Sequence, residues 1–451
     1  MPATAVSRAE RLDRLRFGRQ HGRLLAGSGV GWALDAMDVG LISFVMAALR
    51  QQWSLDATQL SWIASIGFVG MALGASLGGL LADRIGRRQT FALTLLVYGV
   101  ATGAAALSVG VAMLMALRFL VGIGLGAELP VASTLVSEFA PRRIRGRMVV
   151  ALEAFWAVGW VLAALIGYFI VPSGPDGWRW ALAVGVVPAA YAAVVRWGLP
   201  ESVRFLELKG RHAEAEAAVV AFEQGSGTTA TDVAEPRVSR AVPAEAAVET
   251  APVVEERGSI WSRTYRGRTL ALWVVWFCIN LSYYGAFTWI PTLLVARGFP
   301  LVQSFEYTLI ITLAQLPGYA AAAWLIEVWG RRVTLATFLA GSAVSAVFFG
   351  FATTPAAIIA AGCALSFFNL GAWGALYAIG PELYPTPVRG TGTGAAAAFG
   401  RIASIIAPLS VPFLLGGGGE ALVFGVFGVA FVVAASAALF LPDITGRALD
   451  E

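Results

Sequence analysis

The sequence has little charge for its length. Only 13% of its 451 residues are Asp, Glu, Lys or Arg, whereas 58% are hydrophobic, and the mean hydropathy is +0.72. A soluble protein of this length needs more polar side chains to cover its surface. The composition therefore predicts a protein that lies in a lipid bilayer.

Lysine, cysteine and histidine are also scarce. Lys209 is the single lysine, and its neighbours do not form the Gly-x-x-x-x-Gly-Lys-Ser/Thr phosphate loop of an ATP-driven pump. Cys278 and Cys363 both lie in apolar runs and give no disulfide framework or metal cluster. His21 and His212 fall outside the predicted spans, so a proton relay inside the membrane has to use carboxyl groups. We expect no enzymatic activity, no metal and no cofactor.

The arginines explain the basic composition without nucleic acid. The sequence pI is near 9.3, but the arginines form short clusters between apolar runs, where the positive-inside rule for membrane proteins places them. Residues 1–22 carry several of these arginines and lack the apolar core and cleavage site of a signal peptide. We expect this segment to be a cytoplasmic tail, and we expect no nucleic-acid partner.

Apolar runs of about 20 residues, which as helices cross ~30 Å of hydrocarbon, occur in two groups of six. The segment 200–267 between the groups is rich in charge and proline, which predicts a cytoplasmic linker that is largely disordered after a short amphipathic start. The sequence thus predicts an all-α membrane protein with two six-helix bundles, at 23–199 and 268–441, and a cytoplasmic tail at 442–451. The predicted spans are 23–49, 59–82, 90–109, 111–137, 147–170, 178–199, 268–293, 305–328, 333–352, 356–380, 391–415 and 420–441.

Two motifs recur 244 residues later in the chain. In GLLADRIGRR at 79–88, the part DRIGRR at 83–88 returns as EVWGRR at 327–332, and EFAPRRIRG at 138–146 returns as ELYPTPVRG at 382–390. Arginine clusters fall on one side of the membrane if the spans alternate, so both termini and the linker are predicted to be cytoplasmic. Two parallel halves are the architecture in which a site between the halves opens alternately to each side.

These motifs, together with RFLVGIG at 118–124 and PES at 200–202, resemble those of the major facilitator superfamily. Within that superfamily, WAVG at 156–159 and WGALY at 373–377 are similar to the bacterial niacin transporters and their relatives, the synaptic vesicle glycoproteins. The resemblance implies a multi-pass protein of the inner (plasma) membrane that works by proton-coupled alternating access, as a functional monomer.

The motif loops predict a gate on the cytoplasmic face. Carboxylate and guanidinium groups at helix ends can pair across neighbouring helices and hold that face closed. Alternatively, the arginines only orient the chain, although Asp83 and Gly86 fit this poorly because acids contribute little to orientation and glycine indicates a tight turn. The predicted gate residues are Gly79, Asp83, Arg84, Gly86, Arg87, Arg88, Glu138, Arg145, Glu327, Arg331, Arg332, Glu382 and Arg389.

Ionisable residues within the spans are costly and are therefore candidates for function. Asp35 and Asp38 lie three residues apart near one helix face, and Arg118 lies at a similar depth. Asp38 and Arg118 could form a permanent structural salt bridge. The resemblance to proton-coupled sugar porters implies instead that Asp38 takes up the proton next to Arg118, with Asp35 as a secondary partner. The sequence assigns no role to Glu128 or Glu153.

Arg401 is predicted near the middle of the bilayer with no carboxylate one helical turn away. A guanidinium there needs an anion. This anion could be Glu128, Asp35 or another carboxylate within the membrane. Organic anion transporters of the same superfamily have an arginine in a similar context, and the resemblance implies that Arg401 binds an anionic substrate.

Aromatic and amide side chains fall on consistent helix faces around this arginine. The spacing lets two tryptophans from opposite halves enclose a planar ring, while hydroxyl and amide groups reach its substituents. The alternative for any one aromatic residue is packing against lipid. Besides Arg401, the predicted substrate-binding residues are Trp156, Gly159, Tyr283, Tyr284, Asn369, Trp373 and Tyr377.

The sequence thus favours a secondary transporter that imports a small aromatic monocarboxylate, nicotinate above all, with a proton. Another aromatic acid or a sugar is an alternative substrate, although Asn280-Leu-Ser-Tyr-Tyr in span seven lacks the glutamine-rich set of sugar porters. A membrane sensor that binds a ligand without transporting it is an alternative of another class.

Overall fold

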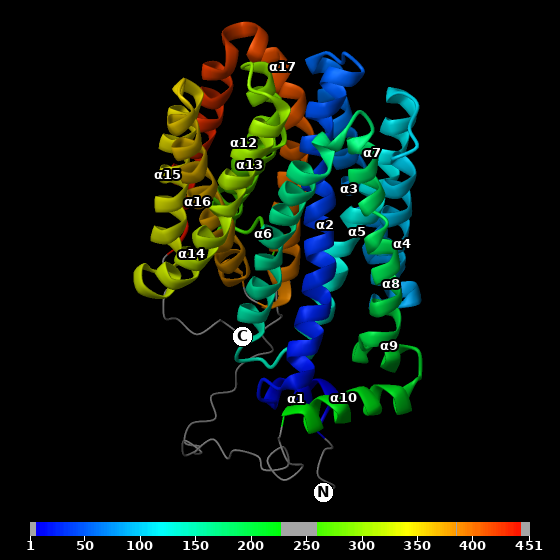
Figure 1. The fold of residues 1–451 in the computed structure, drawn as a ribbon. Coiled ribbons are helices and arrows are strands. Elements are labelled where there is room, and N and C mark those ends of the chain that lie inside the picture. The colour runs from blue at the N-terminus through cyan, green and yellow to red at the C-terminus, as the bar shows by residue number, and fades with distance from the viewer. Residues whose placement is uncertain (1–5, 227–258, 385, 443–451) are drawn as a thin grey trace, which may run out of the picture.

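The structure is a computed structural model that describes residues 6–226, 259–384 and 386–442. Residues 227–258 of the expected linker and most of the expected C-terminal tail lie outside the described residues. The described residues form helices joined by short turns (Figure 1). This confirms the predicted all-α fold class.

The first half of the chain begins with a short helix and continues in long ones. Its helices are α1 (Arg8–Arg14), α2 (Arg19–Gln52), α3 (Ala57–Ile85), α4 (Arg87–Ala105), α5 (Val111–Phe139), α6 (Arg145–Phe169), η1 (Val171–Ser173), α7 (Gly177–Val184), α8 (Val187–Gly198), α9 (Val203–Leu208) and α10 (His212–Ser226). We call the end of the molecule where α1, α9 and α10 lie the basal end (Figure 1).

The second half follows the same plan. Its helices are α12 (Arg266–Ala296), α13 (Leu301–Leu313), α14 (Gln315–Trp329), α15 (Arg331–Phe351), α16 (Pro355–Ile379), η2 (Gly380–Leu383) and α17 (Thr386–Leu439). Helix α17 has non-helical backbone at Gly418 and Gly419 and is therefore two helices joined at a kink.

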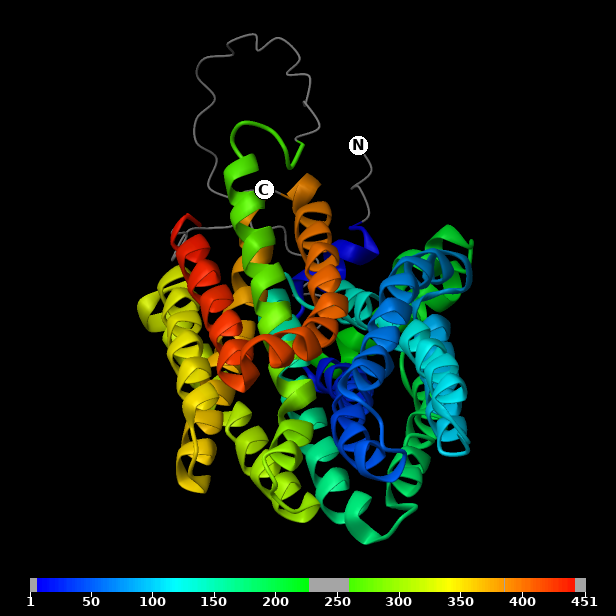
Figure 2. The same ribbon diagram turned by 90° about the horizontal axis from the view of Figure 1, so that it is seen from above.

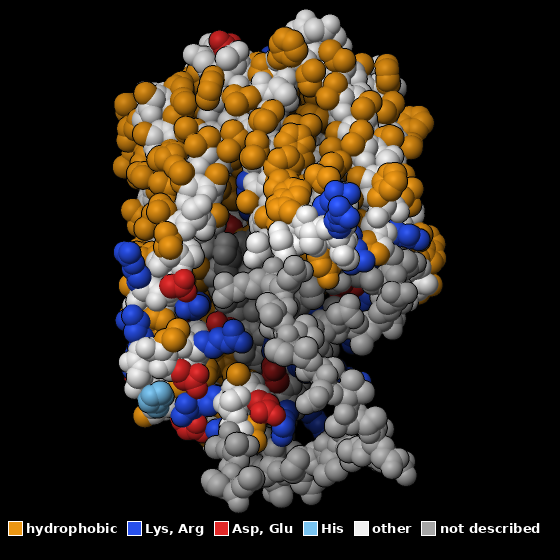
Figure 3. All heavy atoms as spheres, turned by 180° about the vertical axis from the view of Figure 1, so that it is seen from behind, with side chains coloured by type: hydrophobic (Ala, Val, Ile, Leu, Met, Phe, Trp, Pro, Cys, Tyr) orange, Lys and Arg blue, Asp and Glu red, His pale blue; other side chains and the backbone are white. Residues whose placement is uncertain are grey.

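Each predicted span coincides with a helix or with a pair of helices. By length and apolarity, 10 of the described segments can cross a membrane, and one of these is the kinked α17. Helix α4, which starts with two arginines, lies between two of them. Spans six and eight are each interrupted, as α7 with α8 and α13 with α14. In Figure 3 hydrophobic side chains cover much of the upper part of the visible face, and charged ones gather toward the basal end.

The helices pack within each half and meet along a central seam. Helix α3 packs on α5 and α2 on α6 in the first half, while α12 packs on α17 and α15 on α16 in the second. Helices α2, α3 and α6 contact α12, α17 and α13 across the seam (Figures 1 and 2).

Small residues allow helices within the membrane to approach closely. A Cβ atom at Gly122 of α5 would lie 2.0 Å from the carbonyl oxygen of Gly67 in α3, and one at Gly159 of α6 would lie 2.2 Å from that of Ala33 in α2. Substitution at either glycine would force the two helices apart.

Candidate functional site

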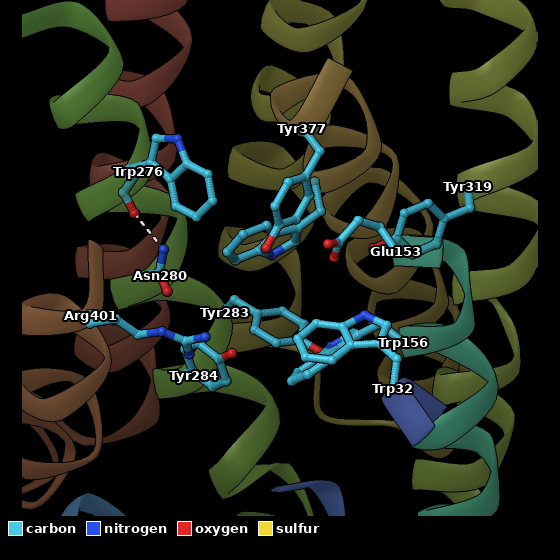
Figure 4. A pocket seen from close by; sticks show the side chains of 11 residues that line it. Trp32, Glu153, Trp156, Trp276, Asn280, Tyr283, Tyr284, Tyr319, Tyr377 and Arg401 are labelled. Carbon is cyan, nitrogen blue, oxygen red and sulfur yellow. Dashed lines mark hydrogen bonds between the residues drawn. The ribbon is translucent and has the colours of Figure 1, made fainter. Parts of the chain in front are cut away.

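A pocket lined by side chains of both halves lies on the seam between them. Figure 4 shows its walls, which are mostly aromatic rings with one arginine and one glutamate. It is lined by Trp32, Glu153, Trp156, Trp276, Asn280, Tyr283, Tyr284, Tyr319, Trp373, Tyr377 and Arg401. A concave, largely aromatic site with a few polar groups is typical of small-molecule binding.

Helix α12 supplies one wall because four of its side chains share a face. Trp276, Asn280, Tyr283 and Tyr284 follow each other at spacings of four, three and one residues. The amide of Asn280 donates to the Trp276 carbonyl at 2.7 Å and accepts from the hydroxyl of Ser404 at 2.8 Å. Asn280 therefore holds α12 against α17, next to Arg401.

Trp156 and Trp373, the two tryptophans that the sequence assigns to the substrate site, both line the pocket. The indole N–H of Trp156 donates to the hydroxyl of Tyr283 at 3.0 Å, which links α6 to α12. Trp373 packs against Trp276 with ring centroids 5.5 Å apart and stacks on Tyr377 at 5.7 Å. Edge and offset contacts of this kind leave ring faces that a planar ligand can contact.

Arg401 reaches the pocket from α17. Among the described residues it forms no salt bridge, although Asp35 and Glu153 lie near enough to interact with it electrostatically. Its guanidinium lies beside the phenol of Tyr284 (Figure 4). Arg401 is therefore a partly buried cation with no carboxylate in an ion pair with it among the described residues.

Two predicted substrate-binding residues do not line the pocket. Asn369 is fully buried, and neither of its amide atoms has a hydrogen-bond partner among the described residues. Gly159 instead allows the close contact between α6 and α2. The sequence interpretation in turn left out Trp32, Trp276 and Tyr319. For Trp276 a signal was present, since it lies one helical turn before Asn280.

Asp38 and Arg118 touch inside the first bundle. Arg118 donates to one carboxylate oxygen of Asp38 at 2.9 Å, and the hydroxyl of Thr102 donates to the other at 2.6 Å. Both charged side chains are buried. The contact satisfies the buried charges, and by itself it fits a structural salt bridge as well as a coupling pair.

Asp35 and Glu128 are buried nearby without such partners. Both are 0% exposed, and none of their carboxyl oxygens has a hydrogen-bond partner among the described residues. They are close enough to interact electrostatically, and Asp35 also interacts with Arg401. Near the Asp38–Arg118 pair, the described residues therefore include two buried carboxyl groups, Asp35 and Glu128, that have no hydrogen-bond or ion-pair partner.

Comparison with known proteins identifies the kind of molecule. The family model described as sugar (and other) transporter matches residues 22–451. The chain belongs to this transporter family. The xylose transporter XylE from E. coli, solved in a partially occluded inward open conformation, has a TM-score of 0.75 at 19% identity and covers 95% of this chain and 100% of its own. The fold is therefore that of the major facilitator superfamily, as predicted.

Two bacterial relatives within this transporter family are named for niacin. The niacin transporter NiaP of Acinetobacter baylyi is 47% identical and covers 90% of this chain and 90% of its own. The putative niacin/nicotinamide transporter NiaP of Bacillus subtilis is 44% identical and covers 93% and 95%. The synaptic vesicle 2-related protein of Rattus norvegicus is 29% identical over 98% of this chain and 81% of its own. The predicted resemblance to both groups is confirmed.

The first-half motif of this transporter forms a compact charge network. Gly86 has a φ of 101° and joins α3 to α4 in a turn, where a Cβ atom would lie 2.4 Å from a carboxylate oxygen of Glu201. Arg87 lies 3.1 Å from Asp83 and 3.8 Å from Glu138, and Glu138 accepts a hydrogen bond from Ser202. Glu201, which the prediction did not include, accepts from the Arg88 backbone N–H at 3.1 Å.

The second-half motif repeats the turn and also pairs an arginine with a glutamate. Gly330 has a φ of 84°, and Arg331 lies 2.6 Å from Glu382. Burial raises the pKa of Glu382, and Arg331 opposes this rise. Glu327 is near enough to interact with Glu382 electrostatically. Arg332 and Arg389 donate to the carbonyl oxygens of Leu441 at 3.4 Å and Tyr384 at 3.2 Å.

The remaining gate residues differ in their surroundings. Arg145 pairs with Asp13 in the N-terminal segment rather than with a loop carboxylate. Gly79 is exposed with open space around it, and Arg84 is exposed beside the first motif. The salt bridges of Arg87 and Arg331 each stay within one half. In this conformation each of these two arginines therefore joins helices within its own half.

Proposed function

We propose that this protein is a secondary transporter that imports nicotinate together with a proton. The observation that carries the proposal is the guanidinium of Arg401, which lines an aromatic pocket beside Tyr284 and forms no salt bridge among the described residues. The niacin transporters at 47% and 44% identity support the same substrate. Arg401 binds the carboxylate, and the rings of Trp156 and Trp373 hold the pyridine ring between the halves.

The proton is carried by the carboxyl groups of the first bundle. Asp38 takes up the proton and releases Arg118, which changes the contact of α2 with α5, while Asp35 lies one turn away as the secondary group. One anion moves with one proton, so the cycle is electroneutral. The pH gradient drives accumulation and the membrane potential does not.

The membrane location, the topology and the gate are proposed on the same alternating-access mechanism. The protein lies in the inner membrane as a functional monomer with both termini and the linker in the cytoplasm. The basal end is then the cytoplasmic face. The motif residues form the gate there, because carboxylate and guanidinium pairs between helices have to rearrange when the halves rock about the central site.

Uptake into proteoliposomes tests the function. Purified protein is reconstituted, and labelled nicotinate is followed with an inward proton gradient, with an imposed potential alone, and with neither. We expect accumulation with the proton gradient alone. Nicotinamide and xylose should compete poorly, because neither carries the negative charge that Arg401 binds. Binding without accumulation under any gradient would favour the sensor.

The arginine is tested by two substitutions. Arg401→Gln removes the charge, and Arg401→Lys keeps it without the planar fork. Loss of a charged hydrogen bond is worth about 1.5–3 kcal/mol, so KM for nicotinate should rise about 10- to 100-fold in Arg401→Gln and less in Arg401→Lys. Unchanged transport by Arg401→Gln would remove the anion assignment.

A further inference from the structure

A carboxyl group faces Arg401 across the pocket. Glu153 lies on α6, one turn before Trp156, and is 3% exposed. Figure 4 shows its carboxyl group and the guanidinium of Arg401 extending into the pocket from opposite sides, with aromatic rings between them. The pocket therefore has a cationic end and a carboxyl end.

Glu153 has no hydrogen-bond or ion-pair partner among the described residues. The indole N–H of Trp32 lies beside its carboxyl group but is itself without a hydrogen bond. Leaving an ionised carboxylate unpaired among aromatic rings costs more free energy than protonating it. Glu153 is therefore expected to be a neutral acid whose O–H can act as a donor.

Titratable side chains from five other helices face this group or interact with it electrostatically. They are Asp35 of α2, Tyr284 of α12, Tyr319 of α14, Tyr377 of α16 and Arg401 of α17. Arg401 is the single cation in this set. A bound carboxylate neutralises Arg401, so this cation no longer stabilises an ionised Glu153.

We propose that the neutral carboxyl group of Glu153 donates a hydrogen bond to the ring nitrogen of nicotinate while Arg401 binds the carboxylate. The inference rests on the proposed substrate. The pyridine nitrogen is an acceptor on the far part of the ring from the carboxylate oxygens, so one planar molecule presents an acceptor to each end of the pocket. The O–H bond stays intact in this step, and the aromatic walls hold the ring plane.

This arrangement makes Glu153 a specificity-determining residue. Benzoate has the same carboxylate and ring size but a C–H where nicotinate has nitrogen, so it leaves the acid unpaired. A site built around a hydrogen bond rejects the analogue that lacks it. Ionised Glu153 has no donor and repels an anion, so the preference for nicotinate disappears as Glu153 loses its proton.

The test compares nicotinate with benzoate by calorimetric titration of the purified protein across a range of pH. The titration starts at a pH where both ligands are carboxylates and the pyridine nitrogen is unprotonated. There the wild type should prefer nicotinate about tenfold, and the ratio should fall as the pH rises and Glu153 loses its proton. Glu153→Leu should bring the ratio near one by weakening nicotinate alone. Glu153→Gln keeps an N–H donor and a similar volume, so it should keep the ratio and make it independent of pH.

Other results would overturn the assignment. If Glu153→Leu keeps the wild-type ratio of nicotinate to benzoate affinity, another group must donate to the ring nitrogen. If Tyr319→Phe loses that ratio while Glu153→Leu keeps it, the donor is the phenol of Tyr319. Equal binding of both acids by the wild type would overturn the role of Glu153 and leave the aromatic-acid function intact. Binding of neither would overturn the substrate and this inference together.

Discussion

Two aspartates one turn apart on α2 have opposite surroundings. Asp38 accepts hydrogen bonds from Arg118 and Thr102, whereas neither carboxyl oxygen of Asp35 has a partner among the described residues. Their exposed fractions are 1% and 0%. Burial is thus the same, and the neighbours differ. The contrast shows that burial of a carboxyl group does not by itself decide its charge.

The two aspartates therefore differ in their electrostatic partners in this conformation. The contact with Arg118 satisfies the buried carboxylate of Asp38 in this conformation. An unpaired buried carboxyl group is expected to be neutral, so Asp35 holds a proton. If Asp38 is to be protonated during transport, Arg118 has to leave it, and that step requires the helices to move.

The largest expected effect comes from breaking the pair. Asp38→Asn leaves the Arg118 guanidinium buried without its anion, which should destabilise the protein by about 3–5 kcal/mol. Thermal unfolding of the detergent-solubilised protein measures this as a lower Tm. Proton-driven accumulation should be lost as well.

The double substitution Asp38→Asn with Arg118→Leu separates charge from packing. Removing both charges should recover most of the lost stability while accumulation stays absent. A double variant no more stable than Asp38→Asn alone would mean that the pair is not what holds these helices.

The second effect comes from the hydroxyl group on the other carboxylate oxygen. Thr102→Val keeps the shape and removes the donor, and a hydrogen bond to a charged group is worth about 1.5–3 kcal/mol. Tm should fall less than in Asp38→Asn. Thr102→Ser keeps the hydroxyl and is the matched control. Equal losses in the two variants would assign the effect to packing.

The fold and part of the site can be predicted from the sequence because both depend on the spacing of residues along the chain. Runs of about 20 apolar residues predict the spans, and four-residue steps place Trp373 and Tyr377 on one face. Which face turns inward depends on tertiary packing. Gly159 sits against Ala33, and this close approach of α6 to α2 could not be predicted from either segment alone.

The two aspartates illustrate the same limit. A separation of three residues puts their side chains about 60° apart around the helix. The sequence therefore places Asp35 and Asp38 near one face, as predicted. That rotation still turns one toward Arg118 and leaves the other near Glu128. Sequence spacing predicts such neighbours only when the rotation of every surrounding helix is known.

Asp35→Asn sharpens the comparison with a smaller effect on stability. The amide resembles the protonated acid and no partner is lost, so the free energy of unfolding should change by about 1 kcal/mol or less. Nicotinate exchange by the variant should persist at high pH. Exchange by the wild type should slow there, because Asp35 has lost its proton. Exchange with unlabelled nicotinate inside the vesicles measures this. A fall in Tm as large as that of Asp38→Asn would contradict the assigned difference.

The smallest effect is expected at Glu128, which is as buried as Asp35 and lies outside the pocket lining. Glu128→Gln should leave KM for nicotinate within about twofold and stability within about 1 kcal/mol, because no ion pair is removed. A double-mutant cycle then asks which aspartate it acts with. If Glu128 and Asp35 share their environment, their coupling should reach about 0.5–3 kcal/mol. The cycle with Asp38, whose oxygens are already occupied by Arg118 and Thr102, should give a smaller value, and the reverse order would break the contrast between the two aspartates.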